Sequence, residues 1–378
     1  MRKILICVLM ALLSISHTSV VQASVSVSAK AAIVVENSSG KVLFAKNADA
    51  RLPMASTTKI MTAICTIENT RTDSLITVAD EAVGIEGSSI YLVKDEKITV
   101  RDLLYGMMLN SGNDAATALA IETSGSVEEF ARLMNETAKR IGAKNTNFVN
   151  ACGLYDDNHY TTAYDLALIT SYALKNPLFA EIVSSKTAKI TNGDNGYPRV
   201  LRNHNKLLNL FDGCIGVKTG YTKKCGRCLV SAAERDGVTL TCVTLNAPDD
   251  WNDHTALLNY GFSKTKLVEL ASQDSHCMGL KIQGSASAFS HVVFGESLSY
   301  VAADNIAEDV KINYSFIENL KAPLNEGEVV GKAELFVSGV LCDTAVLVCS
   351  EPVPLMPRPK FGEVVLSNIK SYFSLYSF

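Results

Sequence analysis

Three short motifs occur in one order along the 378-residue chain and constrain its fold more than any other feature. They are Ser56–Lys59 (STTK), Ser111–Asn113 (SGN) and Lys218–Gly220 (KTG). Each motif alone is short enough to arise by chance, but their joint order is not. A serine followed three residues later by a lysine places a hydroxyl and an amine one helical turn apart on the same face. The first motif therefore predicts a serine nucleophile with a basic group beside it.

The predicted chemistry needs a base beside the serine. A serine hydroxyl is a poor nucleophile until a neighbouring group accepts its proton, and Lys59 is the predicted base for Ser56. The lysine amine must be uncharged near neutral pH, which burial and a second cation achieve by lowering its pKa. We expect Lys218 to be that second cation. The helix N-terminus at Ser56 also directs a free amide toward a developing oxyanion.

Together the motifs resemble the signature of penicillin-binding proteins and class A β-lactamases, with Gly112 as a departure at the middle of the second motif. The chain is similar to low-molecular-mass penicillin-binding proteins of the serine D-alanyl-D-alanine carboxypeptidase type, and the likeness weakens after about residue 265. The stretches that carry it, besides the motifs, are 39–43, 52–62, 159–166 and 216–222. The resemblance implies an α/β catalytic domain of the penicillin-recognising serine transpeptidase and β-lactamase-like fold.

The resemblance also implies a role for each motif residue. Ser111 would relay a proton to the leaving amine, and Asn113 would hold the substrate backbone. Thr219 would hydrogen-bond the terminal carboxylate of the substrate. The backbone N–H groups of Ser56 and Tyr221 would form the oxyanion hole. The catalytic set is therefore Ser56, Lys59, Ser111 and Asn113, and the substrate-binding set is Lys218, Thr219, Gly220, Tyr221 and Arg202.

Taken singly, several of these residues have purely structural interpretations. Ser56 could cap a helix, Asn113 could belong to a turn, and Lys218 could be a solvated charge on a strand. Arg202 resembles a family arginine that helps anchor the cleft, and a surface salt bridge is its alternative role. The ordered set of motifs favours the functional interpretation.

Three further observations concern the surroundings of the site. Some relatives place another arginine for the substrate carboxylate after the strand that follows the third motif, but residues 246–254 contain none. His159 and Asp165 are expected to order a loop beside the site, with direct chemistry as the less favoured role for His159. The motif set calls for no metal and no cofactor.

The first residues predict export. Arg2 and Lys3 precede the apolar run 4–15, and the small-residue site 21–23 follows, so residues 1–23 are identified as a signal peptide. A buried N-terminal helix is the alternative. Removing residues 1–23 deletes two basic residues and no acid, so the formal charge changes from −4 to −6. Basic residues are not massed into a run, and nucleic-acid binding is therefore not predicted.

Residues 24–264 form the predicted catalytic domain, in which strands and helices are mixed. A hydrophobic content of 47% with 20% charged residues fits a globular protein. The pattern predicts paired strands at 31–36 and 41–45, and a strand at 238–243 that is the last of the sheet. Helices are predicted at 56–67, 100–110, 127–141 and 249–260.

A change of pattern after Gly261 predicts a second domain. Alternating apolar residues at 310–316 and 333–337 indicate short half-buried strands, so residues 265–354 are predicted to be all-β. Residues 355–378 are predicted to be a proline-rich linker and an amphipathic helix. The aromatic apolar face of this helix fits a membrane surface, and packing on the β domain is the alternative.

The chain has ten cysteines, of which Cys7 lies in the predicted signal peptide. The nine that remain cannot all pair within one chain. Cys225 and Cys228 have the spacing of a redox or zinc motif. Because the two positions are expected on a strand, where residues three apart face opposite sides, we favour buried apolar roles for them.

These observations favour an exported serine D,D-carboxypeptidase that acts on peptidoglycan stem peptides at the outer face of the cytoplasmic membrane. β-Lactam antibiotics would be its covalent inhibitors. A D,D-endopeptidase would use the same machinery and is the closest alternative. A class A β-lactamase needs a glutamate that the stretch 153–158 does not supply, and a catalytically silent peptidoglycan-binding protein would be expected to have lost a motif residue.

Overall fold

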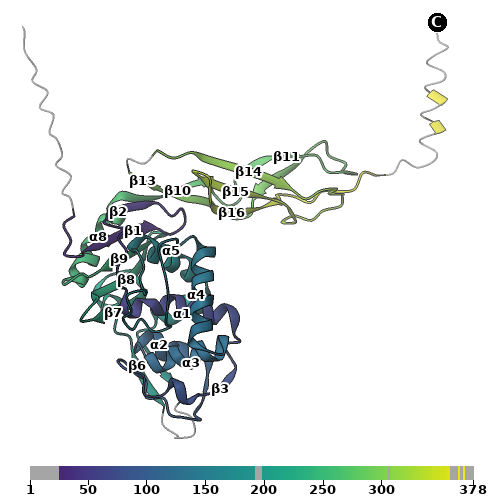
Figure 1. Cartoon of the computed structure of the whole chain (residues 1–378). Helices are drawn as coiled ribbons and strands as arrows, with labels where there is room; N and C mark the ends of the chain where they lie inside the picture. Colours follow the sequence, from purple (N-terminus) through teal and green to yellow (C-terminus); the bar gives the residue numbers. More distant parts are fainter. Residues whose placement is uncertain (1–24, 192–197, 305–306, 358–364, 367–368, 371–378) are drawn as a thin grey trace, which may run out of the picture.

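The structure, a computed structural model, describes residues 25–191, 198–304, 307–357, 365–366 and 369–370. Its first domain is built around a five-stranded sheet in the order β2-β1-β9-β8-β7, with every neighbouring pair antiparallel. The strands are β1 (Ala31–Glu36), β2 (Val42–Lys46), β7 (Cys214–Thr222), β8 (Gly226–Arg235) and β9 (Val238–Leu245). Strand β7, which carries the third motif, forms one edge of the sheet (Figure 1).

Helices cover both faces of this sheet. The helices α7 (Leu207–Leu210) and α8 (Asp250–Lys264) pack on one face. The other face carries α1 (Lys59–Asn69), α2 (Val100–Leu109), α3 (Asn113–Ser124), α4 (Val127–Ile141), α5 (Ala163–Leu174) and α6 (Pro177–Ser184). The short remaining elements of this domain are two 3-10 turns, η1 (Ala55–Thr58) and η2 (Asp80–Ala82), and two two-stranded sheets. One sheet pairs β3 (Leu75–Thr77) with β4 (Lys97–Thr99), and the other pairs β5 (Thr187–Ile190) with β6 (Arg199–Arg202).

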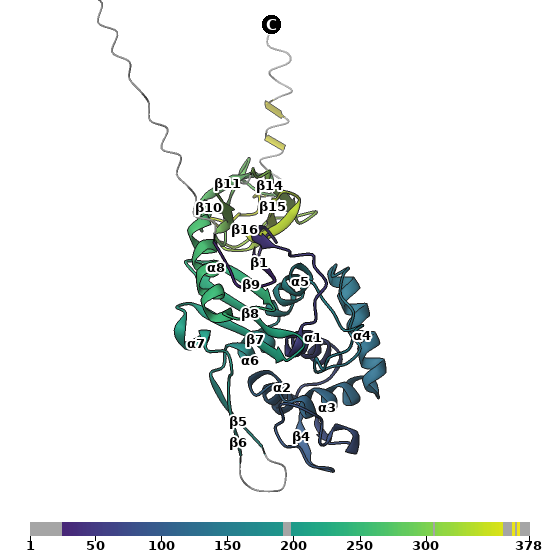
Figure 2. The same ribbon diagram turned by 60° about the vertical axis from the view of Figure 1, so that its left-hand side comes forward.

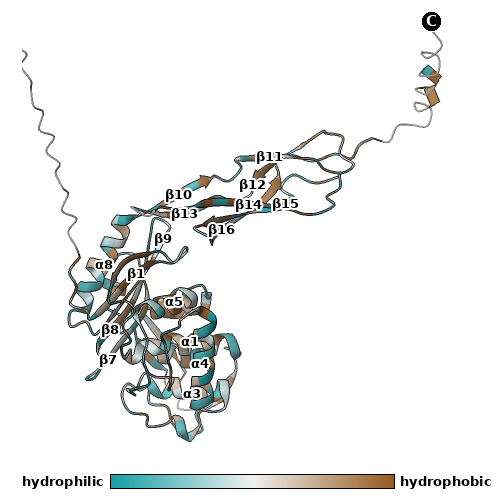
Figure 3. Ribbon diagram, turned by 45° about the horizontal axis from the view of Figure 1, so that its top comes forward, coloured by the Kyte–Doolittle hydropathy of each residue, from teal (hydrophilic) through white to brown (hydrophobic). Residues whose placement is uncertain are grey.

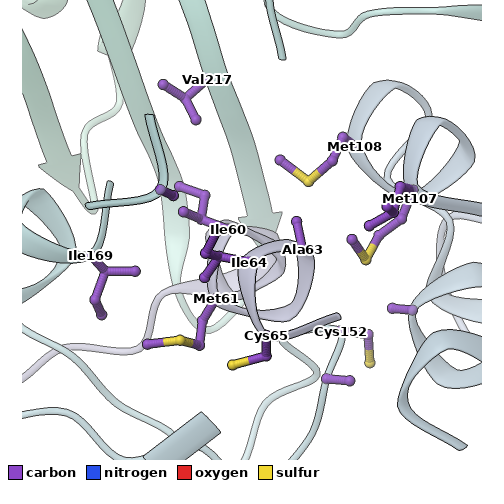
Figure 4. Packing of buried hydrophobic residues seen from close by; sticks show 14 of the residues in the cluster. Ile60, Met61, Ala63, Ile64, Cys65, Met107, Met108, Cys152, Ile169 and Val217 are labelled. Carbon is purple, nitrogen blue, oxygen red and sulfur yellow. The ribbon is translucent and has the colours of Figure 1, made fainter. Parts of the chain in front are cut away.

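Helix α1 lies in the main apolar core and fixes the position of the first motif. Figure 4 shows Ile60 and Ile64 of α1 among buried side chains that include Val217 of β7 and Met108 of α2. All four of these side chains are at most 2% exposed. Burying aliphatic side chains of this size stabilises a fold by about 1.5–3 kcal/mol each. The apolar packing of α1 therefore holds the residues at its N-terminus rigidly against β7.

Residues 265–357 form the second, all-β unit. A five-stranded sheet has the order β11-β12-β16-β15-β14, and β10 pairs with β13 in a separate ribbon. The strands are β10 (Thr265–Ala271), β11 (His276–Leu280), β12 (Ser290–Phe294), β13 (Leu298–Ala303), β14 (Val310–Phe316), β15 (Val329–Val337) and β16 (Val340–Cys349). This unit lies next to β2 and α8, far from β7 (Figures 1 and 2). The partly buried ion pair between Lys41 and Glu308 joins the two units.

The expected secondary structure is largely confirmed. Strands 31–36 and 41–45 correspond to the β1–β2 pair, and the strand at 238–243 is β9, last of the sheet in chain order but central in space. The helix at 127–141 is α4, whose ends have clear causes. Ser126 accepts a hydrogen bond from the backbone N–H of Glu129, and Gly142 ends the helix in a left-handed conformation. Figure 3 shows hydrophilic residues along this outer helix.

Two local expectations need correction. The helix predicted from Ser56 begins as the 3-10 turn η1, and α1 starts only at Lys59. Cys225 lies in the turn between β7 and β8 rather than on a strand. Beyond residue 354, Leu355 still bridges to Ser285, and the backbone N–H of Met356 donates to the carbonyl of Gly284.

The two predicted terminal segments fall mainly outside the described residues. The signal peptide at 1–23 lies wholly outside them. Of the helix predicted within 355–378, the structure describes only residues 365–366 and 369–370, which are helical and exposed. Within the described part of the chain, no helix combines the length and the apolar character needed to cross a bilayer.

Candidate active site

Residues from all three motifs line one cavity of about 300 Å³. The lining residues are Ser56, Ser88, Ser111, His204, Thr219, Gly220, Tyr221, Arg227, Asp250 and Trp251. The cavity opens between the edge strand β7, the turn η1 and the start of α8. A larger cavity of about 480 Å³ lies between the two domains, and no motif residue lines it. The smaller cavity is therefore the candidate active site.

Ser56 and Lys59 are brought into contact where η1 passes into α1. The Nζ atom of Lys59 lies 3.1 Å from the Oγ atom of Ser56. The neighbouring hydroxyls are engaged elsewhere, because Thr57 donates to the carbonyl of Met54 at 2.7 Å and Thr58 donates to the carbonyl of Ala55 at 2.8 Å. Ser56 is thus the hydroxyl of the first motif that faces the amine and the cavity.

The amine of Lys59 is completely buried in a polar cage. It donates to the Oδ1 atom of Asn113 at 2.7 Å and to the carbonyl of Cys152 at 2.6 Å, besides contacting Ser56. Burial lowers the pKa of Lys59 from 10.5 to about 8, although the Asp114 carboxylate nearby favours the charged form. An amine with this pKa is partly uncharged near neutral pH, as a general base must be.

Lys218 is buried on β7 and interacts electrostatically with Lys59. Burial, and next the charge of Lys59, hold the pKa of Lys218 well below its ordinary value. The main cause of the lowered pKa of Lys59, by contrast, is its own burial rather than the charge of Lys218. The expectation that burial lowers the pKa of Lys59 is therefore confirmed, and the charge interaction with Lys218 acts on the pKa of Lys218. The two buried amines therefore repel each other when both are charged.

Ser111 and Asn113 reach the site from the junction between α2 and α3. Ser111 is buried and has a φ of 61°. Asn113 is the first residue of α3 and binds Lys59 through Oδ1 and the carbonyl of Glu86 through Nδ2. A side chain at the middle position of the motif would collide with its neighbours, because a Cβ on Gly112 would lie 2.8 Å from Oδ1 of Asp114. The departure at Gly112 therefore suits the local packing.

The edge strand β7 approaches the nucleophile most closely at Gly220. A Cβ at this position would lie 3.0 Å from the backbone nitrogen of Ser56, so a residue without a side chain is needed there. Thr219 and Tyr221 lie on either side of this contact and line the cavity, and Tyr221 is 66% exposed. This close approach brings the backbone of β7 next to η1, as the expected oxyanion hole requires.

The remaining predicted residues lie at different distances from the cavity. Arg202 is exposed on β6 and does not line the cavity, whereas His204, two residues later, does.

His159 is buried behind the nucleophile. Its Nδ1 atom accepts from the backbone N–H of Val149, so the proton sits on Nε2 and is donated to Oγ1 of Thr58. Burial lowers the pKa of His159 to about 4, which keeps it neutral and suits a positioning role.

Asp165 orders the loop that leads to His159. Its Oδ2 atom accepts hydrogen bonds from the backbone N–H of Asn145 at 2.6 Å and from Oγ1 of Thr146 at 2.8 Å. Thr146 in turn contacts the hydroxyl of Thr161 at 2.8 Å. Asp165 therefore anchors the segment that carries His159 through Thr146 and Thr161.

Cys225 and Cys228 are 2% and 0% exposed. Burial raises the pKa of Cys228 to about 12, which disfavours the reactive thiolate that redox chemistry needs. All nine cysteines in the described residues have free thiols. Across this part of the chain, no three His, Cys, Asp or Glu side chains are grouped to hold a metal ion.

Our sequence reasoning missed five residues of the cavity wall: Ser88, His204, Arg227, Asp250 and Trp251. Asp250 and Trp251 belong to the stretch noted only for its lack of an arginine. Arg227 lies between Cys225 and Cys228, in a stretch whose pattern gives no signal for a binding role. The pairing of Tyr221 with Arg227 across β7 and β8 would have indicated that arginine, but the turn between the strands had to be known first.

Comparison with known proteins decides the family. The sequence model described as D-alanyl-D-alanine carboxypeptidase matches residues 17–249, which include all three motifs. The chain belongs to the D-alanyl-D-alanine carboxypeptidase family. A second model, described as the C-terminal domain of penicillin-binding protein 5, matches residues 266–355.

Individual relatives of this carboxypeptidase family member cover most of its length. The D-alanyl-D-alanine carboxypeptidase DacF of Bacillus subtilis is 32% identical over 84% of both chains. The crystal structure of penicillin-binding protein 5 from Haemophilus influenzae aligns with a TM-score of 0.62 and 27% identity, covering 88% of this chain and 99% of that one. A D-alanyl-D-alanine endopeptidase of Pseudomonas aeruginosa is 31% identical over 57% of this chain and 70% of its own.

Proposed function

We propose that this chain is a serine D,D-carboxypeptidase that removes the terminal D-alanine from peptidoglycan stem pentapeptides. The observation that carries the proposal is the 3.1 Å contact between a fully buried Lys59 amine and the Ser56 hydroxyl at the wall of a cavity. Membership of the family supports the substrate class. In this proposal the catalytic residues are Ser56, Lys59, Ser111 and Asn113.

Acylation begins with the neutral amine of Lys59. Ser56 Oγ attacks the carbonyl carbon of the penultimate D-alanine while its proton passes to Nζ of Lys59. The backbone N–H groups of Ser56 and Tyr221 stabilise the oxyanion, and each such donor contributes about 10²–10³ in rate. The C–N bond then breaks, and the leaving amine of D-alanine takes a proton through Ser111. The products of this half-reaction are an acyl-serine and free D-alanine.

Deacylation reverses the proton path. Water attacks the ester carbonyl, Lys59 accepts its proton, and the C–O bond to Ser56 breaks with return of that proton to Oγ. Asn113 accepts a hydrogen bond from the Lys59 amine at 2.7 Å, so in this proposal it orients the base. A penicillin would form the same ester, which makes β-lactams covalent inhibitors.

The pKa of Lys59 predicts how acylation depends on pH. Because the neutral amine is the base, kcat/KM for acylation should rise with pH and level off above an apparent pKa of about 8. Below that value the rate should fall about tenfold per pH unit. His159, with a pKa of about 4, stays neutral throughout this range. Stopped-flow acylation by a chromogenic β-lactam between pH 6 and 10 measures the profile. A flat profile, or one that falls with rising pH, would remove Lys59 from the role of base.

Defined substrates separate this function from its competitors. Purified protein should release one D-alanine per monomeric pentapeptide, as measured by mass spectrometry of the products. Cleavage of cross-linked dimers without D-alanine release would favour the D,D-endopeptidase, an alternative supported by the Pseudomonas aeruginosa relative. Rapid turnover of penicillin would favour a β-lactamase, and absence of both acylation and cleavage would favour a silent peptidoglycan-binding protein.

The proposal includes export and attachment to the membrane surface. The basic and apolar pattern of residues 1–23 supports export. The aromatic amphipathic pattern of residues 361–378 supports a helix that lies in the interfacial layer at the outer face of the cytoplasmic membrane. The β domain separates this segment from the catalytic cavity along the chain, so anchoring and chemistry should be independent.

Deleting residues 361–378 should therefore release the protein from liposomes and leave activity on a soluble pentapeptide unchanged, because lipid is the proposed partner of the apolar helix face. Flotation of the full-length and truncated mature proteins, with D-alanine release measured on both, makes the comparison. Flotation of the truncated protein, or failure of the full-length protein to float, would show that this helix does not attach the protein to the membrane.

A further inference from the structure

The wall of the cavity that Ser56 lines also contains an arginine held by two neighbours. Nε and Nη2 of Arg227 contact Oδ1 of Asp250 at 2.9 Å and 2.8 Å, and the guanidinium lies 5.7 Å from the ring centroid of Trp251. The side chain of Arg227 is 42% exposed and that of Asp250 only 4%. Because Asp250 contacts Nε and Nη2 of Arg227, the Nη1 edge of the guanidinium is left for a ligand.

Strand register places this arginine beside the substrate-binding strand. Arg227 on β8 pairs with Tyr221 on β7, and residues directly paired across antiparallel strands lie on the same face. Thr219 is two residues before Tyr221 and therefore shares that face. All three residues line the cavity. The hydroxyl of Thr219 and the guanidinium of Arg227 consequently border one part of the cavity.

Arg227 is also the cation best suited to meet an anion there. Within the described cavity lining, the other basic side chain is His204, whose pKa is lowered by burial and by the charge of Lys218. Lys218 itself is buried outside the lining, and burial and the charge of Lys59 hold its pKa well below the ordinary value. Arginine stays charged at all relevant pH values and presents a planar fork that matches a carboxylate. Its contact with Asp250 fixes its orientation, which lowers the entropy cost of binding a ligand.

We propose that Arg227 determines specificity by binding the carboxylate of the substrate's terminal D-alanine through its Nη1 edge, beside the hydroxyl of Thr219. This inference rests on the proposed function, which supplies the substrate. Residues 246–254 contain no arginine for the substrate carboxylate, and the inference assigns that role to Arg227 on β8 instead. Asp250 and Trp251, which belong to that stretch, then position the Arg227 side chain.

The test compares two ligands that differ only at the carboxylate. A peptide ending in D-alanyl-D-alanine and the same peptide as its C-terminal amide are titrated into the Ser56→Ala protein, which binds without turnover. Trp251, the only tryptophan in the chain, reports binding by fluorescence, and calorimetry checks the dissociation constants. Adding Arg227→Gln should weaken binding of the free acid by about 10- to 100-fold, because one charge-assisted contact is lost. Binding of the amide should change by less than about twofold.

Two further variants distinguish recognition from folding. Arg227→Lys should restore part of the affinity for the free acid, since it returns the charge without the fork. Arg71→Gln, which also removes an arginine paired with an aspartate but at an exposed position, should change nothing. Equal losses for acid and amide, or no loss for the acid, would overturn the inference. Release of D-alanine by the unsubstituted protein is measured in parallel, and its absence would instead overturn the proposed function.

Discussion

Replacing Ser56 with alanine is expected to lower both penicillin acylation and D-alanine release by at least about 10³-fold, with no change in the fold. The neighbouring hydroxyls cannot take over, because Thr57 and Thr58 donate to the carbonyls of Met54 and Ala55. Ser111 faces the cavity from another element, and among the described residues the Lys59 amine bonds to Ser56, Asn113 and Cys152 rather than to Ser111. Acylation kinetics with a labelled penicillin, and D-alanine release from a pentapeptide, measure the two losses.

A matched control uses a serine away from the cavity. Ser171 of α5 donates to Oδ1 of Asn37 at 3.2 Å and is partly buried, so Ser171→Ala tests the effect of losing a hydroxyl without touching the site. This variant should keep normal kinetics. Activity of the Ser56→Ala protein above about 1% of normal would mean that another residue is the nucleophile.

Replacing Lys59 with methionine should lower acylation by about 10²–10⁴-fold while the protein stays folded. Burial lowers the pKa of Lys59 from 10.5 to about 8, so the folded protein binds fewer protons than the unfolded chain between these values. Holding this lysine in the core therefore costs about 3 kcal/mol at neutral pH. Methionine avoids this cost but loses the hydrogen bonds to Asn113 and Cys152, worth about 1 kcal/mol each.

These opposing effects nearly cancel, and the melting temperature should move by less than about 5 °C. The double variant Ser56→Ala, Lys59→Met should be no slower than Ser56→Ala alone, because a base without a nucleophile contributes nothing. Thermal denaturation and acylation kinetics on the same preparations separate the two effects. Near-normal acylation by the Lys59→Met protein would identify a different base.

Elements with strong local signals could be predicted from the sequence. The helix at 127–141 has an apolar face at helical spacing, a serine at its start and a glycine after its end, and α4 has these bounds. The turn that carries Ser56 could not be predicted in this way. Ala55 has a φ of 48°, and its carbonyl accepts from Thr58, which His159 contacts from 101 residues away. Such a conformation depends on tertiary contacts that no local pattern contains.

In the candidate active site, too, features set by local sequence could be predicted and features set by tertiary packing could not. The spacing of Ser56 and Lys59 on one helical turn is local, so their contact could be expected from sequence. The ionisation of Lys59 could be predicted in direction, but its main cause is complete burial, which only the packed fold reveals. Arg227 could not be placed, because its position beside Tyr221 depends on the register between β7 and β8.

The position of the covalent bond formed with a β-lactam tests the acyl-serine mechanism most directly. The protein is incubated with benzylpenicillin, digested, and the modified peptide is sequenced by mass spectrometry. We predict one penicilloyl group per chain, attached to Ser56 next to the Lys59 amine. Attachment to Ser111 or to any other residue, or absence of a covalent adduct from a folded protein, would contradict the assignment of Ser56 as the nucleophile.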